Sequence, residues 1–214
     1  ESGDAVINQI NYNNPIRTTP RVHKSIITFM DVQGVSFQSY AESRFQKTKK
    51  MSKVKAGSSK YRSKMKKLIS ASKTPLTVPL HSLRSPFHDI ALENFRHILL
   101  YMLGKPGANK GIEGLTHIRA VVRNGLERES LRDEIYCQLV KQTHNNLKER
   151  CEALMWELMA ICTGCFACSY FLKNLVKYFE DVMENPGDVG AWASYCKDRL
   201  LKTAERGKRL FVPV

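Results

Sequence analysis

Residues 107–185 contain no proline, and apolar side chains recur through this stretch at the spacing of helices. No alternating pattern typical of strands competes with that spacing in the C-terminal half. The sequence therefore predicts an all-α fold, a single compact multi-helix bundle whose helices pack by ridges and grooves around one core. The expected helices, including one that follows the Pro186-Gly187 break, lie around Ile112–Val122, Leu131–Val140, Ala153–Ile161, Phe171–Val182 and Val189–Leu200.

The N-terminal part of the chain has a different composition. Residues 1–22 are polar and rich in asparagine, so we expect residues 1–33 to form an extended flank or linker and residues 34–214 to form the helical domain. A first packed helix is expected near 36–48, because Phe37, Tyr40, Ala41 and Phe45 share one helical face. Further along, Pro75 and Pro79 impose an extended chain.

The positive charge of the chain is concentrated in one segment. The net charge is +14, and residues 44–73 contribute twelve basic residues and no acidic one. Such a segment attracts polyanions, whether nucleic acid, anionic lipid or the acidic tails of tubulin. Nucleic acid is disfavoured because Tyr61 is the only aromatic residue among residues 46–73. A solvated, partly disordered and flexible insert is the alternative. The candidate binding residues in this segment are Lys47, Lys49, Lys50, Lys53, Lys55, Lys60, Arg62, Lys64, Lys66 and Lys67.

Nothing in the sequence points to catalysis, a cofactor or a membrane span. The six histidines show no metal-binding spacing, and no pattern indicates a perturbed carboxylate pair. Cys162, Cys165 and Cys168 could bind zinc only together with a fourth ligand. Cysteines at such positions are more commonly small buried residues with free thiols, as expected in a reducing cytosol. We therefore expect no enzyme activity, no cofactor, no metal and no transmembrane segment.

The stretch Leu131–Thr143 reads as a core helix, with Ser130 expected as its N-cap and Asp133 in the capping-box position. It closely resembles the signature helix of MyTH4 (myosin tail homology 4) domains, found in unconventional myosins of the myosin X and myosin VII types, related kinesins and adaptors. Further segments resemble that family in the same order along residues 34–214. They are Phe37–Ala41 with Phe45, Pro79-Leu80, Phe95–Met102, Trp156–Met159, Thr163–Phe166, Leu201–Thr203 and Phe211–Pro213. The turn Ala167–Ser169 departs from the family's usual proline-containing turn, and residues 46–73 look long and basic for the family.

This resemblance implies a cytoplasmic, cytoskeleton-associated binding or scaffolding module of a larger motor-tail or adaptor protein. Its implied partners are microtubules or cargo-protein segments, with a FERM domain in the parent chain. The alternatives are a structural spacer that supports an adjacent FERM or Rho GTPase-activating domain, and a phosphoinositide- or nucleic-acid-binding basic segment. Arg132, Asp133, Glu134 and Trp156 are expected to be structural, through ion pairing, capping and packing. Further basic residues expected on exposed faces are Lys141, Lys148, Arg150, Lys173 and Lys177.

Overall fold

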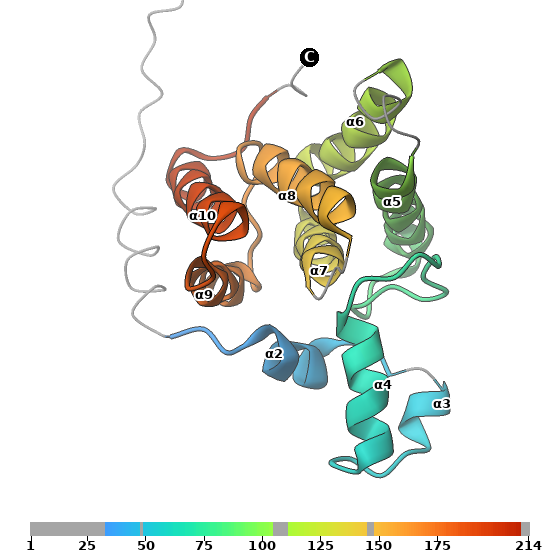
Figure 1. Cartoon of the computed structure of the whole chain (residues 1–214). Helices are drawn as coiled ribbons and strands as arrows, with labels where there is room; N and C mark the ends of the chain where they lie inside the picture. Colours follow the sequence, from blue (N-terminus) through green and yellow to red (C-terminus); the bar gives the residue numbers. More distant parts are fainter. Residues whose placement is uncertain (1–32, 48, 105–110, 145–147, 211–214) are drawn as a thin grey trace, which may run out of the picture.

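The computed structural model describes residues 33–47, 49–104, 111–144 and 148–210 (Figure 1). All regular secondary structure in these residues is helical, which confirms the predicted all-α class. None of these helices is both long and apolar enough to cross a membrane. The helices are α2 (Phe37–Arg44), α3 (Lys49–Ser52), α4 (Ser59–Ile69), α5 (Ser85–Leu103), α6 (Ile112–Glu127), the 3₁₀-helix η2 (Glu129–Leu131), α7 (Arg132–Thr143), α8 (Glu149–Thr163), α9 (Leu172–Met183) and α10 (Asp188–Arg206).

Helix α7 lies at the centre of the bundle. Every residue from Glu134 to Thr143 is buried, including several that are polar. Helix α8 packs against it, α5 packs against α6, α7 and α8, and α10 packs against α8 and α9. The apolar side chains Leu131, Ile135 and Leu139 have no exposed surface, as their helical spacing predicts. Because α7 is enclosed on all sides, its polar residues must find partners inside the protein.

The helix that precedes the basic segment docks on the far end of the bundle. Helix α2 contacts α9 and α4. The centre of the Tyr40 ring on α2 lies 4.6 Å from the centre of the Phe171 ring. The chain enters α2 through Gly34, where a Cβ atom would come within 2.3 Å of the carbonyl oxygen of Lys173. The next residue, Val35, donates its backbone N–H to Asn174 Oδ1 at 2.9 Å. These contacts fix the approach of the described N-terminal residues to α9.

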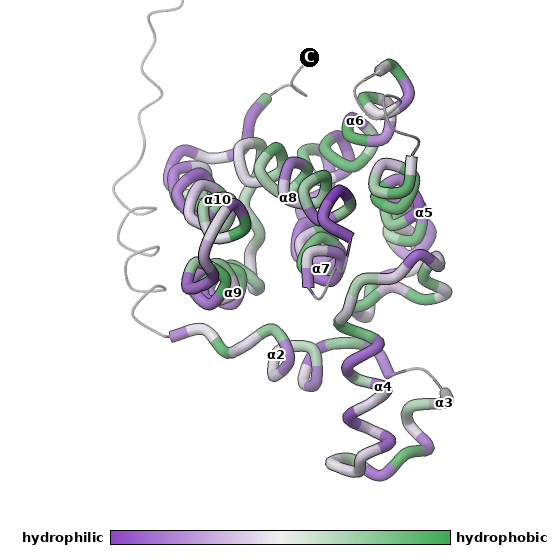
Figure 2. Tube along the Cα trace, viewed as in Figure 1, coloured by the Kyte–Doolittle hydropathy of each residue, from purple (hydrophilic) through white to green (hydrophobic). Residues whose placement is uncertain are grey.

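The basic segment contains an ordered helix, so the flexible-loop alternative is wrong for residues 59–69. Helix α4 begins after Ser58, whose hydroxyl accepts a hydrogen bond from Tyr61 N at 3.2 Å. Tyr61, Met65 and Ile69 are buried and lie four residues apart along one face of the helix. This apolar stripe anchors α4 to the core while leaving its other side to solvent, and Figure 2 shows that α4 is largely hydrophilic.

The expected N-cap at Ser130 is not formed. Residues 129–131 make the 3₁₀-helix η2, which runs directly into α7, and the N-cap position is occupied by Leu131 without a side-chain hydrogen bond. Because Ser130 already lies within helical geometry, it does not occupy the extended cap conformation. The carboxylate of Asp133 is therefore available to another element.

All six cysteines are buried as free thiols. Burial raises the pKa of the thiols of Cys137, Cys162 and Cys168 well above the ordinary value, and that of Cys196 to about 12. No group of three or more histidine, cysteine or acidic residues is arranged to hold a metal ion in the part of the chain that the structure describes.

We expect the thiols to resist modification in the folded protein, because the thiolate is the reactive form and burial disfavours it. Titration with Ellman's reagent near neutral pH should detect all six thiols in denaturant and almost none in the native protein within the same time. Rapid reaction of one or more thiols without unfolding would contradict the buried arrangement.

Candidate functional site

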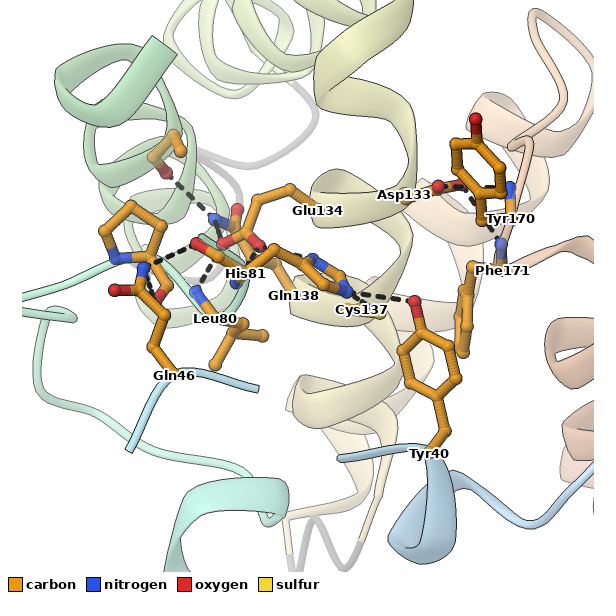
Figure 3. A network of polar contacts seen from close by, with 12 residues as sticks. Tyr40, Gln46, Leu80, His81, Asp133, Glu134, Cys137, Gln138, Tyr170 and Phe171 are labelled. Carbon is orange, nitrogen blue, oxygen red and sulfur yellow. Dashed lines mark hydrogen bonds and ion pairs between the residues drawn. The ribbon is translucent and has the colours of Figure 1, made fainter. Parts of the chain in front are cut away.

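Glu134 on α7 holds the extended segment that follows the basic helices (Figure 3). Its carboxylate is 1% exposed and accepts hydrogen bonds from the backbone N–H groups of Leu80 and His81, both at 2.8 Å. It also contacts His81 Nδ1 at 2.8 Å and accepts from Gln138 Nε2 at 2.9 Å. A buried carboxylate is costly unless it is fully hydrogen-bonded, so these contacts account for its presence in the core.

The next polar residues of α7 continue this role toward α4. Gln138 donates to the carbonyl oxygen of Ala91 at 2.9 Å. Gln142 accepts from Ser72 N at 2.9 Å and donates to Ser72 O at 2.8 Å, as a paired strand would. Together with Glu134 and Lys141, they form what we call the polar ladder of α7. The ladder satisfies backbone groups of the irregular segments at Ser72 and at Leu80 and His81, and it also binds carbonyl oxygens on α5 and at the end of α4.

Lys141 corrects one expectation from the sequence, because it lies in the interior and not on an exposed basic face. It is 2% exposed, and its ammonium group donates to the carbonyl oxygens of Ser70 and Lys67 at the end of α4. Burial lowers the pKa of this amine to about 8. The physical reason is the central position of α7, which leaves no side of the helix open to solvent. Lys141 thus binds the carbonyl oxygens at the C-terminal end of α4 and does not add to the surface charge of that helix.

Asp133 binds backbone N–H groups at the start of α9. Its carboxylate accepts hydrogen bonds from three successive backbone N–H groups, those of Ser169 at 2.8 Å, Tyr170 at 3.1 Å and Phe171 at 3.3 Å. These groups precede α9, whose first residue is Leu172. A carboxylate at a helix N-terminus also interacts favourably with the helix dipole. Asp133 therefore caps α9 and not the helix that contains it.

Replacing Asp133 with alanine is expected to lower the free energy of unfolding by about 1–2 kcal/mol, the usual loss for a helix cap. Water can reach Ser169 and Tyr170, which are exposed, so the loss stays below that of a fully buried group. Chemical denaturation of D133A checks the magnitude. The matched variant D188A removes an exposed acid from the first turn of α10, where its side chain makes no hydrogen bond to the described residues, and should change stability by about a few tenths of a kcal/mol.

The other signature residues are also structural. Arg132 donates from Nε to the carbonyl oxygen of Gly125 at 2.8 Å, and its guanidinium lies 6.0 Å from the centre of the Phe166 ring. Trp156 on α8 is 1% exposed and stacks on Tyr178, with ring centres 6.3 Å apart. Arg132 thus connects α6, α7 and the turn after α8 through a hydrogen bond and a ring contact.

A cavity of about 450 Å³ lies beside the start of α7, and its lining includes Tyr40, His81, Asp133 and Glu134. These ionisable groups already have partners: Tyr40 Oη contacts His81 Nε2 at 3.0 Å, and both carboxylates are occupied by backbone N–H groups (Figure 3). Burial raises the pKa of the Tyr40 hydroxyl. A general acid or base needs a free position facing a substrate. The cavity therefore offers structural groups, with no free pair set for proton transfer.

The basic side chains of α4 point away from the core. We call Lys60, Arg62, Lys66 and Lys67 the α4 basic face, because all of them are exposed and lie opposite the buried stripe of the helix. No ion pair joins these residues to an acid within the described residues. In the sequence, the nearest acids are Glu42 and Asp89, so the basic segment itself supplies no acid to pair with these cations. An uncompensated cationic surface of this kind attracts anions.

Other predicted residues surround α4 or lie apart from it. Lys47, Lys53 and Lys55 are exposed, Lys64 is half-buried, and the side chains of Lys49 and Lys50 lie outside the described residues. Four more lie outside α4, on or next to other helices. On α9, Lys177 pairs with Asp181 at 2.6 Å, and Lys173 is half-buried beside Gly34. At the start of α8, Lys148 is exposed and Arg150 donates to Gly104 O at 2.8 Å.

A second set of cations was not predicted from the sequence. Arg199, Lys202 and Arg206 lie three and four residues apart on α10, and this spacing was the signal that could have identified them. The segment containing them also includes Asp198 and Glu205, so its cations do not form an uninterrupted basic run like that at 44–73.

Comparison with known proteins gives a consistent result. Residues 118–214 match the family model described as the MyTH4 domain. The chain is 38% identical over 102 residues to unconventional myosin heavy chain 6 of Caenorhabditis elegans. The matched stretch covers 47% of this chain and 5% of that myosin. The MyTH4-FERM MF1 domain of Dictyostelium discoideum myosin VII shares the fold, with a TM-score of 0.70 and 24% identity over 94% of this chain and 37% of that one.

A human structure shares the fold as well. It is the C-terminal MyTH4-FERM domain of myosin 7b, solved in complex with the harmonin-a PDZ3 domain, with a TM-score of 0.65 and 24% identity. The match covers 85% of this chain and 34% of that one. The chain therefore spans only a small part of the myosin that it matches, and less than two fifths of these solved chains.

Proposed function

This chain carries a MyTH4 domain, and from that premise we propose that it is a non-catalytic binding module which attaches its parent protein to microtubules. The α4 basic face would meet the acidic C-terminal tails of tubulin. The observation that carries this proposal is the exposed, uncompensated charge of α4, which is anchored to the core by Tyr61, Met65 and Ile69. We further propose a cytoplasmic, cytoskeleton-associated location and a FERM domain in the parent chain.

The proposed attraction is electrostatic and depends on many weak contributions. An exposed ion pair contributes about 0–1 kcal/mol, and salt screens it over about 10 Å at 0.1 M. Affinity would therefore come from the number of cations that face an acidic tail at once. Oligomerisation of the parent protein would raise the apparent affinity further, because the second attachment becomes intramolecular.

Two other functions follow from the same fold. The module could bind a cargo segment, and the human myosin 7b MyTH4-FERM structure contains a bound harmonin domain. It could also be a spacer that supports a neighbouring FERM or Rho GTPase-activating domain. The α4 basic face favours an acidic partner over the spacer, because a spacer has no need of an uncompensated charged surface. Nucleic acid is disfavoured, since the two aromatic residues of the basic segment 44–73, Phe45 and Tyr61, are both buried.

Co-sedimentation with stabilised microtubules tests this proposal. We expect the chain to pellet at low salt and to be released as salt rises from about 50 to about 200 mM. Microtubules treated with subtilisin, which removes the acidic tails, should retain much less of the chain. Failure to pellet with intact microtubules at low salt would remove the microtubule function and leave the cargo and spacer functions.

A further inference from the structure

The C-terminal end of α10 carries a second concentration of positive charge. Arg199, Lys202 and Arg206, which we call the α10 cation row, recur at intervals of three and four residues and therefore lie on one face of the helix. Thr203, four residues after Arg199, places a hydroxyl group on the same face. Lys202 and Arg206 are exposed, and neither forms a salt bridge with an acid among the residues that the structure describes.

The chain then folds back beside this row. Gly207, with φ of 88°, ends α10 in a backbone conformation that side-chain-bearing residues rarely adopt. Beyond it, Lys208 Nζ donates to Leu126 O at 2.8 Å, and Arg209 Nε donates to Gly164 O at 2.8 Å. Lys208 is thus bound to α6 and Arg209 to the residue that ends α8. Both line the same cavity as the α10 cation row.

These elements enclose a cavity of about 270 Å³. Its lining residues are Gly164, Arg199, Lys202, Thr203, Arg206, Gly207, Lys208 and Arg209. The lining contains five cations and no acid. The arrangement is concave and comes from two chain segments, unlike the convex face of α4. Helix C-termini attract single cations through their dipoles, but this does not explain five cations that converge on one cavity.

One atom in this cavity lacks a partner. Nε of Arg199 is buried and has no hydrogen-bond partner among the described residues, although Nη1 of the same side chain donates to Tyr195 Oη at 2.8 Å. The guanidinium also lies 5.3 Å from the centre of the Tyr195 ring, which fixes its plane. A buried N–H without an acceptor is unfavourable, so the hydrogen-bonding capacity of this guanidinium is not fully used inside the protein.

We propose that this cavity binds a polyphosphorylated inositol headgroup, either soluble or as part of a lipid. Each phosphate monoester carries about −1.5 to −2 charges at pH 7, so two or three of them on one small ring match five convergent cations. The guanidinium groups suit phosphate oxygens through paired N–H donors. An extended acidic peptide needs a groove, whereas this site is a compact cavity. The site lies on α10 and is independent of the microtubule function proposed for α4.

Isothermal titration with inositol trisphosphate tests the proposal on the whole chain. The wild type should bind, and K202A/R206A should bind at least about tenfold more weakly, since it removes two charge-assisted contacts. Both residues are exposed, so the variant should keep the wild-type circular dichroism spectrum and melting temperature. The matched control is K66A/K67A, which removes the same charge from α4 and should change the affinity less than about twofold.

Further arms distinguish the source of the phosphate groups. Flotation with phosphatidylcholine vesicles, with and without phosphatidylinositol bisphosphate, identifies a lipid headgroup if binding needs the bisphosphate and the soluble trisphosphate competes. Binding of the trisphosphate without flotation identifies a soluble ligand. The proposal is overturned if the wild type does not bind the trisphosphate, if both double variants lose affinity equally, or if a polyglutamate peptide binds the cavity and the trisphosphate does not.

Discussion

Replacing Glu134 with alanine is expected to lower the free energy of unfolding by about 3–5 kcal/mol, the usual loss when one partner of a buried ionic network is removed. The substitution leaves the N–H of Leu80 buried without an acceptor, and it removes the acceptor of His81 N as well. It also takes away one of the two acceptors of Gln138 Nε2. Equilibrium unfolding in urea, followed by circular dichroism, measures the change.

Two further variants make the Glu134 experiment specific. In E134Q, the amide keeps one acceptor oxygen but turns an NH₂ group toward a backbone donor, so its loss of stability should be smaller than that of E134A and still above about 1 kcal/mol. E129A removes an exposed acid three residues before the first residue of α7 and should stay within about 0.5 kcal/mol of the wild type. If E134A were as stable as E129A, the polar ladder of α7 would not hold the segment at Leu80 and His81.

A loss of similar size is expected for Trp156→Ala. The indole is 1% exposed, stacks on Tyr178 and lies 6.2 Å from the ring of Phe179, so its removal opens a cavity between α8 and α9. Removal of a buried aromatic side chain costs about 3–5 kcal/mol. The same urea unfolding measurement tests the prediction, and a change below about 1 kcal/mol would contradict the packing described for this residue.

The variant W156F separates packing from hydrogen bonding at this position. The indole Nε1–H is buried and has no partner among the described residues. Phenylalanine removes that unsatisfied donor while keeping most of the ring volume, so its loss should be at most about half that of W156A. The second tryptophan provides a control, because Trp192 is half-buried and W192A should cost clearly less than W156A.

The helices of the core could be predicted from the sequence because the apolar residues of each helix recur at helical spacing and so share one face. Phe37, Tyr40 and Ala41 predicted α2 in this way, and Leu131, Ile135 and Leu139 predicted α7. Helix α4 was less evident, since its three buried residues are separated by cations whose high density also fits a solvated loop. Its order comes from tertiary contacts that a single segment does not reveal.

The roles of the polar residues in α7 depended on the fold. Asp133 and Glu134 were expected to be structural, and the groups that they bind lie 36 and 54 residues away along the chain. Lys141 was wrongly placed on the surface because an ordinary amphipathic helix exposes its polar side, whereas α7 exposes none of the residues from Glu134 to Thr143. The α10 cation row was not predicted because acids are interspersed with its cations in the sequence, whereas no acid lines the cavity.

The most direct test of the central claim, that the exposed charge of α4 performs the binding, compares two charge reversals in microtubule co-sedimentation. K66E/K67E reverses charge on the α4 basic face, and K202E/R206E makes the same change in net charge on α10. We predict that K66E/K67E lowers microtubule affinity by about tenfold or more at low salt, while K202E/R206E stays close to the wild type, with both variants folded by circular dichroism. Equal losses in the two variants, or no loss in K66E/K67E, would contradict the account.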